Sequence, residues 1–104
     1  MSKRLAMLEK MVASGSADSF ARYALALEYA GLDRMDDALA AFIALREADA
    51  GYVPMYLMCG SMLSKAGRAA EGREWLSEGL TVARAKGDDH AQSEIQSALD
   101  SLPA

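Results

Sequence analysis

The sequence predicts an all-α protein of about six helices, and three observations support this fold class. Hydrophobic residues make up 52% of the 104 residues; alanine, leucine and methionine, which favour helices, dominate them, while β-branched residues are sparse. Apolar residues recur at helical spacing in segments joined by short connections, as antiparallel helix pairs require. A pattern of large and small residues also returns after 34 residues, and such a period indicates stacked repeats.

The first helix is expected at about 2–12, where the apolar stripe consists of Leu5, Leu8 and Val12. The small and polar residues of 13–18 then break this pattern. Either Ser16 or Asp18 can cap the second helix, because a short side-chain oxygen accepts a hydrogen bond from a free backbone N–H. We expect this second helix to end at about Gly31.

The third helix is expected at about 35–48, and two aspartates in its first turn suit the positive end of the helix dipole. The fourth is expected at about 54–66. Pro54 lies in its first turn, where the missing N–H does no harm, and Gly67 ends it. The second to fourth helices are therefore each bounded by a recognisable start or stop signal.

The fifth helix is expected at about 69–85, with Gly87 ending it. Asp88 or Asp89 can cap a sixth helix. The apolar stripe of this last helix consists of Ala91, Ile95, Ala98, Leu99 and Leu102. Pro103 lies beyond the helix, and no linker or second domain is indicated.

The charge balance disfavours some classes of partner. The formal net charge is -4 and the sequence pI is about 4.9, whereas a nucleic-acid backbone or an anionic membrane needs a cationic face. Charge is uneven: 28–49 carries six acidic residues against two arginines. The start of the chain is mildly basic, with Lys3, Arg4 and Lys10 against Glu9. We therefore expect neither nucleic acid nor a membrane as the partner.

The composition also suggests a location. The single cysteine permits no disulfide framework within the chain and fits a reducing compartment. No apolar run approaches the roughly 20 residues of a membrane span. Charged residues interrupt the start of the chain, where a signal peptide would need an apolar segment. We expect a soluble, cytoplasmic protein.

Two segments carry the 34-residue pattern, LALEYAGLDRMDDALAAF and CGSMLSKAGRAAEGREWL. The first places large and small residues at Leu25, Ala26, Tyr29, Ala38 and Phe42; the second places them at Cys59, Gly60, Leu63, Gly72 and Leu76. This pattern resembles the tetratricopeptide repeat, a helix–turn–helix unit. Gly67 matches its turn glycine, and Tyr56 stands where the family often has tryptophan.

The resemblance implies a right-handed superhelical array of antiparallel helix hairpins that forms one domain over 1–104. A half-repeat helix would occupy 1–14, repeat one 19–52, repeat two 53–86 and a capping helix 88–102. Arrays of this kind usually need such a solubilising cap.

The resemblance also implies a protein-interaction module, because the first helices of successive repeats line a concave groove. Helical spacing places Phe20, Tyr23 and Leu27 on one face, away from the packing stripe. We expect an apolar groove that binds a peptide or helix of another protein. The candidate partner-binding residues are Phe20, Tyr23, Leu27, Leu57, Met58, Ser61 and Lys65.

Two alternatives stay open. These side chains could instead belong to the core, which is the interpretation we favour for Phe20. The apolar groove or the end helices could also pair two copies of the chain, which would make the protein a structural homodimer. A carboxylate clamp of the kind that holds chaperone tails is not expected, because the chain has no asparagine.

The sequence offers little reactive chemistry. Cys59 is the only thiol and lies on the predicted packing face, where cysteine is usually a small inert apolar residue. His90 is the only imidazole and is expected to be solvated. A zinc site would need three or four ligands, and no glycine-rich phosphate loop occurs. We therefore expect no metal, no cofactor and no enzymatic activity.

Overall fold

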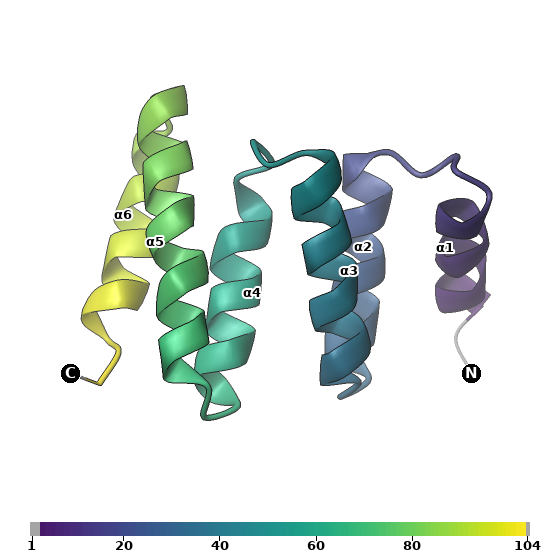
Figure 1. Ribbon diagram of the computed structural model, residues 1–104, viewed down its shortest axis with the longest axis horizontal. Helices are drawn as coiled ribbons and strands as arrows, with labels where there is room; N and C mark the ends of the chain where they lie inside the picture. The colour runs from purple at the N-terminus through teal and green to yellow at the C-terminus, as the bar shows by residue number, and fades with distance from the viewer. Residues whose placement is uncertain (1–2, 104) are drawn as a thin grey trace. The chain divides into compact units, whose positions relative to one another are not determined.

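Six helices and no strand occur in the part of the chain that the computed structural model describes, residues 3–103. They are α1 (Lys3–Ala13), α2 (Ser19–Gly31), α3 (Met35–Ala48), α4 (Pro54–Lys65), α5 (Ala69–Lys86) and α6 (Asp89–Asp100), as Figure 1 shows. The chain divides into two compact units between Ala50 and Gly51. Unit 1 contains α1 to α3, and unit 2 contains α4 to α6. The predicted all-α fold is confirmed.

The helix ends follow from local chemistry. Asp18 caps α2, since its carboxylate accepts a hydrogen bond of 2.8 Å from the amide of Ala21. Asp88 caps α6 in the same way. Gly67 and Gly87, which follow α4 and α5, have φ angles of 83° and 68°, a conformation that glycine adopts without strain. The predicted limits agree with the observed helices to within about two residues; Ser2 of the first expected helix lies outside the described residues.

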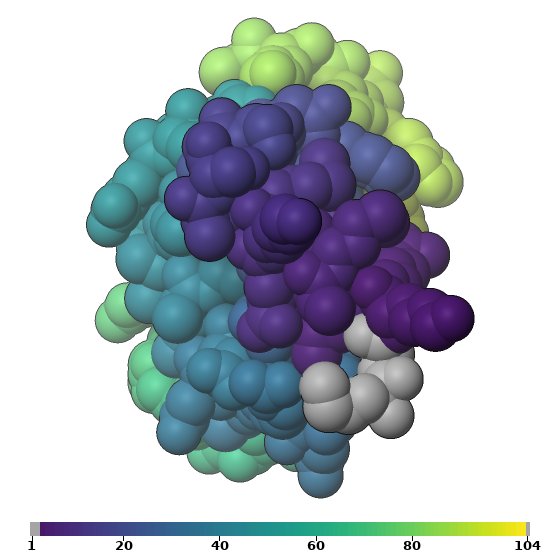
Figure 2. Space-filling model, turned by 90° about the vertical axis from the view of Figure 1, so that its right-hand side faces the viewer, coloured from purple at the N-terminus to yellow at the C-terminus, as the bar shows by residue number. Residues whose placement is uncertain are grey.

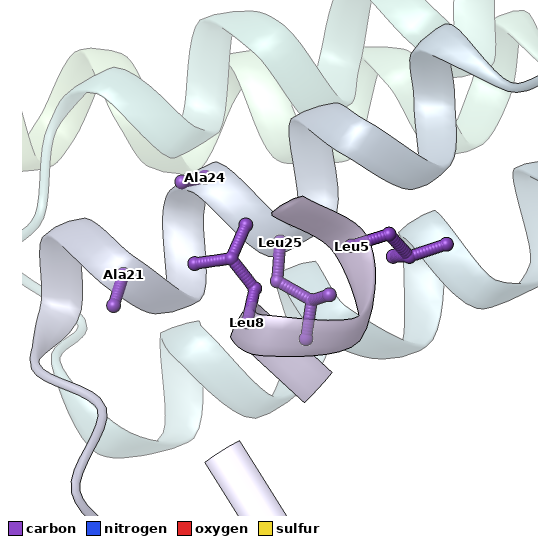
Figure 3. Close-up of a cluster of buried hydrophobic side chains, with 5 residues drawn as sticks. All are labelled: Leu5, Leu8, Ala21, Ala24 and Leu25. Carbon is purple, nitrogen blue, oxygen red and sulfur yellow. The ribbon is translucent and has the colours of Figure 1, made fainter. Parts of the chain in front are cut away.

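The core of unit 1 includes a cluster between α1 and α2. Its buried residues are Leu5, Leu8, Ala21, Ala24 and Leu25 (Figure 3). Met11, Val12, Ala17 and Tyr29 are partly buried and pack against this cluster. The stripe predicted for the first helix therefore supplies the α1 side of the cluster.

Two polar contacts also join α1 to α2. The Tyr29 hydroxyl donates a hydrogen bond of 2.5 Å to Glu9, and the Arg4 guanidinium lies 3.1 Å from a carboxylate oxygen of Glu28. The hydrogen bond, together with burial and the charge of Glu9, raises the pKa of Tyr29 to about 12. Both contacts connect the N-terminal helix to α2 at the edge of the apolar cluster.

α2 and α3 form a helix pair in which small and aromatic residues at matched repeat positions are buried. Ala26, Ala38 and Phe42 have no exposed surface. The hydroxyl of Ser19, at the start of α2, donates a hydrogen bond of 2.7 Å to Asp49, just after α3. Small and aromatic residues at these positions are what the repeat pattern predicts.

Unit 2 has its own core, with a buried cluster of Val53, Leu76, Ala83 and Ile95. Ile95 comes from the predicted apolar stripe of α6, and most of that stripe packs against the cluster. Tyr56 and Trp75 are also buried, with ring centroids 6.0 Å apart. Among residues 3–103, no helix combines the length and apolar character needed to cross a lipid bilayer.

Candidate protein-binding surface

Phe20 is the most exposed of the candidate apolar residues. It is the second residue of α2, and 65% of its surface is accessible. The interpretation of Phe20 as a core residue is therefore wrong. Ala21 and Leu25, one and five residues further along, face the buried cluster, and this leaves Phe20 at the edge of that face, on the same side of the helix as Ala24.

The other two candidates on α2 are less exposed than Phe20. Tyr23 and Leu27 are half-buried. They lie three and seven residues after Phe20 in the sequence, a spacing that places all three on one side of a helix. α2 thus presents an apolar side that is most exposed at its N-terminal end.

A cleft of about 390 Å³ lies between α1 and α2, and Phe20 forms part of its lining. The other apolar side chains that line it include Met7, Leu8 and Met11 of α1. Met7 is 57% exposed. Figure 2 views unit 1 from the side of α1, whose side chains (purple) form the surface nearest the viewer. Phe20 is therefore not isolated but shares an exposed apolar surface with methionines of α1.

Sequence reasoning missed the contribution of Met7 and Met11 to this cleft. The spacing of four residues places both on one side of α1, and Met11, three residues after Leu8, adjoins the buried stripe. Methionine at such a position is ordinary core filler, so only the packing of α1 on α2 reveals that a cleft opens there. The signal available in the sequence for this cleft was a pair of methionines outside the apolar stripe.

The candidates of unit 2 all lie on α4, in different environments. Leu57 is half-buried and packs against the unit 2 core, so it also has a structural role. Met58 is 40% exposed. Ser61 and Lys65 line a cleft of about 290 Å³, to which Leu102 also contributes. Of the α4 candidates, Met58 is therefore the exposed apolar one and Lys65 the charged one.

The structure places the candidates in two sets, one on α2 and one on α4. The expectation that both sets line a single groove stays a prediction, as do the proposed repeat boundaries. Within unit 1, the set is extended by the methionines of α1, and within unit 2 it adjoins the cleft next to Lys65.

The reactive side chains lie apart from these surfaces. Cys59 is fully buried, as the packing pattern predicts. His90 is exposed and lies 3.0 Å from a carboxylate oxygen of Glu94 on the same helix. Over residues 3–103, no three histidine, cysteine, aspartate or glutamate side chains gather closely enough to hold a metal ion. The candidate surface can bury apolar ligand groups beside cationic side chains.

Comparisons with known proteins identify similar structures. No family model matches the sequence, and no curated protein matches it significantly. A crystal structure and a solution structure of a tetratricopeptide repeat domain protein from Salinibacter ruber are each 36% identical to this chain. Their TM-scores are 0.73 and 0.75. The alignments cover 80% and 79% of this chain and 92% and 83% of the Salinibacter chain.

A protein from Bordetella parapertussis, known from a solution structure, is also similar. It is 29% identical, with a TM-score of 0.81. The alignment covers 96% of this chain and 87% of the Bordetella chain. The similarity thus extends over all six helices and is not confined to one hairpin.

Proposed function

The chain belongs to the tetratricopeptide repeat family, and from this we propose that it binds a peptide or helix of a partner protein through the apolar sides of α2 and α4. The family indicates a protein-interaction module in general. The proposal adds the residues: Phe20, Tyr23 and Leu27 on α2, and Leu57, Met58, Ser61 and Lys65 on α4.

The exposure of Phe20 is the observation that carries this proposal. The described residues include four large hydrophobic side chains that are exposed, namely Met7, Phe20, Leu32 and Met58. Two of the four, Phe20 and Met58, occupy candidate groove positions. Burying one such side chain against a ligand contributes about 1.5–3 kcal/mol. An exposed phenylalanine at an expected binding position therefore supports peptide capture by apolar burial.

The remaining candidates would have different tasks. Tyr23 and Leu27 would widen the apolar contact along α2, and Met58 would adapt to ligand shape through its flexible thioether side chain. Ser61 and Lys65 would form a polar rim, with Lys65 available to a ligand carboxylate. On α4, Met58 would thus supply apolar contact and Ser61 and Lys65 its polar edge, an arrangement that is usual at protein interfaces.

The proposal can be tested by selecting peptides from a random displayed library on the wild-type chain. The dissociation constant of the tightest peptide is then measured for Phe20→Ser, Met58→Ser and Leu32→Ser. We expect the first two variants to weaken binding about tenfold or more each, which corresponds to about 1.4 kcal/mol. Leu32→Ser is the matched control, because Leu32 is also exposed on unit 1 but is not a candidate.

Failure to enrich any peptide, or equal affinity in all three variants, would rule out this surface as the binding site. The alternative function, a self-associating homodimer, has a separate test. The same exposed side chains could pair two copies, so light scattering after size exclusion should be recorded over a wide concentration range. A mass near the 11.1 kDa of one chain throughout would exclude the homodimer.

A further inference from the structure

The cleft between α1 and α2 has a mixed apolar and cationic border. Met7 and Met11 of α1 and Phe20 of α2 line it, and so does Arg4. Lys3 and Lys10 are exposed on α1 and lie four residues before and three residues after Met7, so the three residues follow one side of the helix. An exposed apolar residue therefore stands between two exposed lysines.

These lysines have no anionic partner among the described residues, 3–103. The neighbouring carboxylates are already engaged. Glu28 pairs with Arg4, Glu9 accepts the hydrogen bond of Tyr29, and Asp18, which lines the cleft, caps α2. The positive charge of Lys3 and Lys10 is thus directed to solvent beside the cleft.

This local charge contrasts with the rest of the molecule. α1 carries three cationic side chains against one carboxylate, whereas the whole chain has a formal net charge of -4. α6, in contrast, carries three carboxylates, Asp89, Glu94 and Asp100, and no lysine or arginine. The net charge of α1 therefore favours an acidic ligand, whereas that of α6 disfavours one.

We propose that the α1–α2 cleft binds an acidic amphipathic helix of a partner protein. Apolar residues at i, i+3, i+4 and i+7 would contact Met7, Met11 and Phe20. Acidic residues along the flank of that helix would face Lys3 and Lys10. The inference rests on the proposed function, since Phe20 belongs to both surfaces, and it adds the cleft-lining residues of α1 and the chemistry of the partner.

The charges would mainly select the partner, and the apolar contacts would provide most of the affinity. Exposed ion pairs are individually weak and screened by salt. They nevertheless raise the association rate and disfavour partners of the wrong sign. Binding of the acidic helix should therefore weaken as the salt concentration rises.

The test uses two labelled synthetic peptides of equal length with identical leucine spacing. One carries glutamates on the flanks of the leucine face, and the other carries lysines there. Fluorescence polarisation gives the dissociation constant of each with the full chain. We expect the acidic peptide to bind at least about tenfold more tightly than the basic peptide at low salt. We expect Met7→Ser and Phe20→Ser each to weaken the binding of both peptides about tenfold or more.

A charge reversal separates recognition from structure. The Lys3→Glu, Lys10→Glu double variant should weaken the binding of the acidic peptide and strengthen the binding of the basic one. General damage to the fold would not produce this result. The matched control is the Arg84→Glu, Lys86→Glu double variant, which makes the same change of charge in unit 2 at two exposed residues of α5 that are not candidates for binding. It should leave the preference for the acidic peptide intact.

Three outcomes would overturn the inference. Equal affinity for both peptides would show that charge does not select the partner, while leaving peptide binding itself in place. No binding of the acidic peptide, when library peptides do bind through Phe20, would show that the partner has another chemistry. A concentration-dependent dimer mass that disappears in the Lys3→Glu, Lys10→Glu variant would show that a second copy occupies the cleft. If no library peptide binds either, the proposed function is refuted together with this inference.

Discussion

Gly60 and Gly72 face each other where α4 crosses α5. A Cβ atom on Gly72 would lie 2.8 Å from the carbonyl oxygen of Gly60 and would also collide with the Ser64 hydroxyl. A Cβ on Gly60 would lie 2.6 Å from the Leu76 side chain. The two small residues are therefore a steric requirement of this crossing, and they occupy positions that the 34-residue pattern matched.

Gly72→Ala should destabilise unit 2 by about 1–3 kcal/mol, because overpacking against a backbone carbonyl exceeds the gain of about 1 kcal/mol in helix propensity. Gly31→Ala is the control. A Cβ there would meet nothing within 4 Å, so we expect a stabilisation of about 0.4–1 kcal/mol. Urea unfolding followed by circular dichroism measures both. Equal effects of the two substitutions would contradict the close crossing.

Tyr29→Phe should reduce the free energy of unfolding by about 1 kcal/mol at neutral pH, because the hydrogen bond to Glu9 is lost. The raised pKa of Tyr29, about 12, also predicts an alkaline effect. The folded state favours the neutral phenol, while the unfolded chain ionises near its ordinary pKa of about 10.

The stabilisation from Tyr29 is therefore fully present below about pH 10 and is lost as the pH rises to about 12. Stability curves of wild type and Tyr29→Phe, measured by urea unfolding at several pH values, should converge over this window. A difference in stability that stays constant up to pH 12 would mean that the phenol is not held by Glu9 in the folded chain.

Phe20→Ser should leave stability nearly unchanged, within about 0.5 kcal/mol, because the side chain is exposed. Leu8→Ala, in contrast, should reduce the free energy of unfolding by about 2–5 kcal/mol, since Leu8 is only 5% exposed and belongs to the α1–α2 cluster. Thermal unfolding of the two variants compares them directly. A large loss with Phe20→Ser would return Phe20 to the core and remove the main support for the binding surface.

Asp18→Ala should destabilise α2 by about 1 kcal/mol, because the amide of Ala21 loses its acceptor. Ser16→Ala is the control, since the Ser16 hydroxyl contacts the Met11 carbonyl oxygen and does not cap α2. Hydrogen exchange of the first amides of α2 reports the local effect. Faster exchange in Ser16→Ala than in Asp18→Ala would show that the wrong residue has been identified as the cap.

The helices could be predicted from the sequence because their ends carry local signals. Caps such as Asp18 and Asp88, and the glycines after α4 and α5, act within a few residues and need no tertiary contact. The burial of Cys59 also followed from the repeat pattern.

The binding surface was harder to predict because exposure depends on tertiary packing. Phe20 precedes the apolar residues Ala21, Ala24 and Leu25, and a large aromatic at such a position resembles core in a sequence. The contribution of Met7 and Met11 depends on where α1 lies against α2, and helical spacing alone does not fix that placement. Leu57 shows the opposite case: it was expected in a groove but also packs on the unit 2 core.

The most direct test of the central claim is amide chemical-shift mapping of the isotope-labelled chain with the tightest peptide from the library. We predict the largest shifts around Phe20, Tyr23 and Leu27 on α2 and around Met58 on α4, with smaller shifts at Met7 and Met11 of α1. Shifts confined to α3, α5 and α6, with α2 and α4 unaffected, would contradict the proposed binding surface.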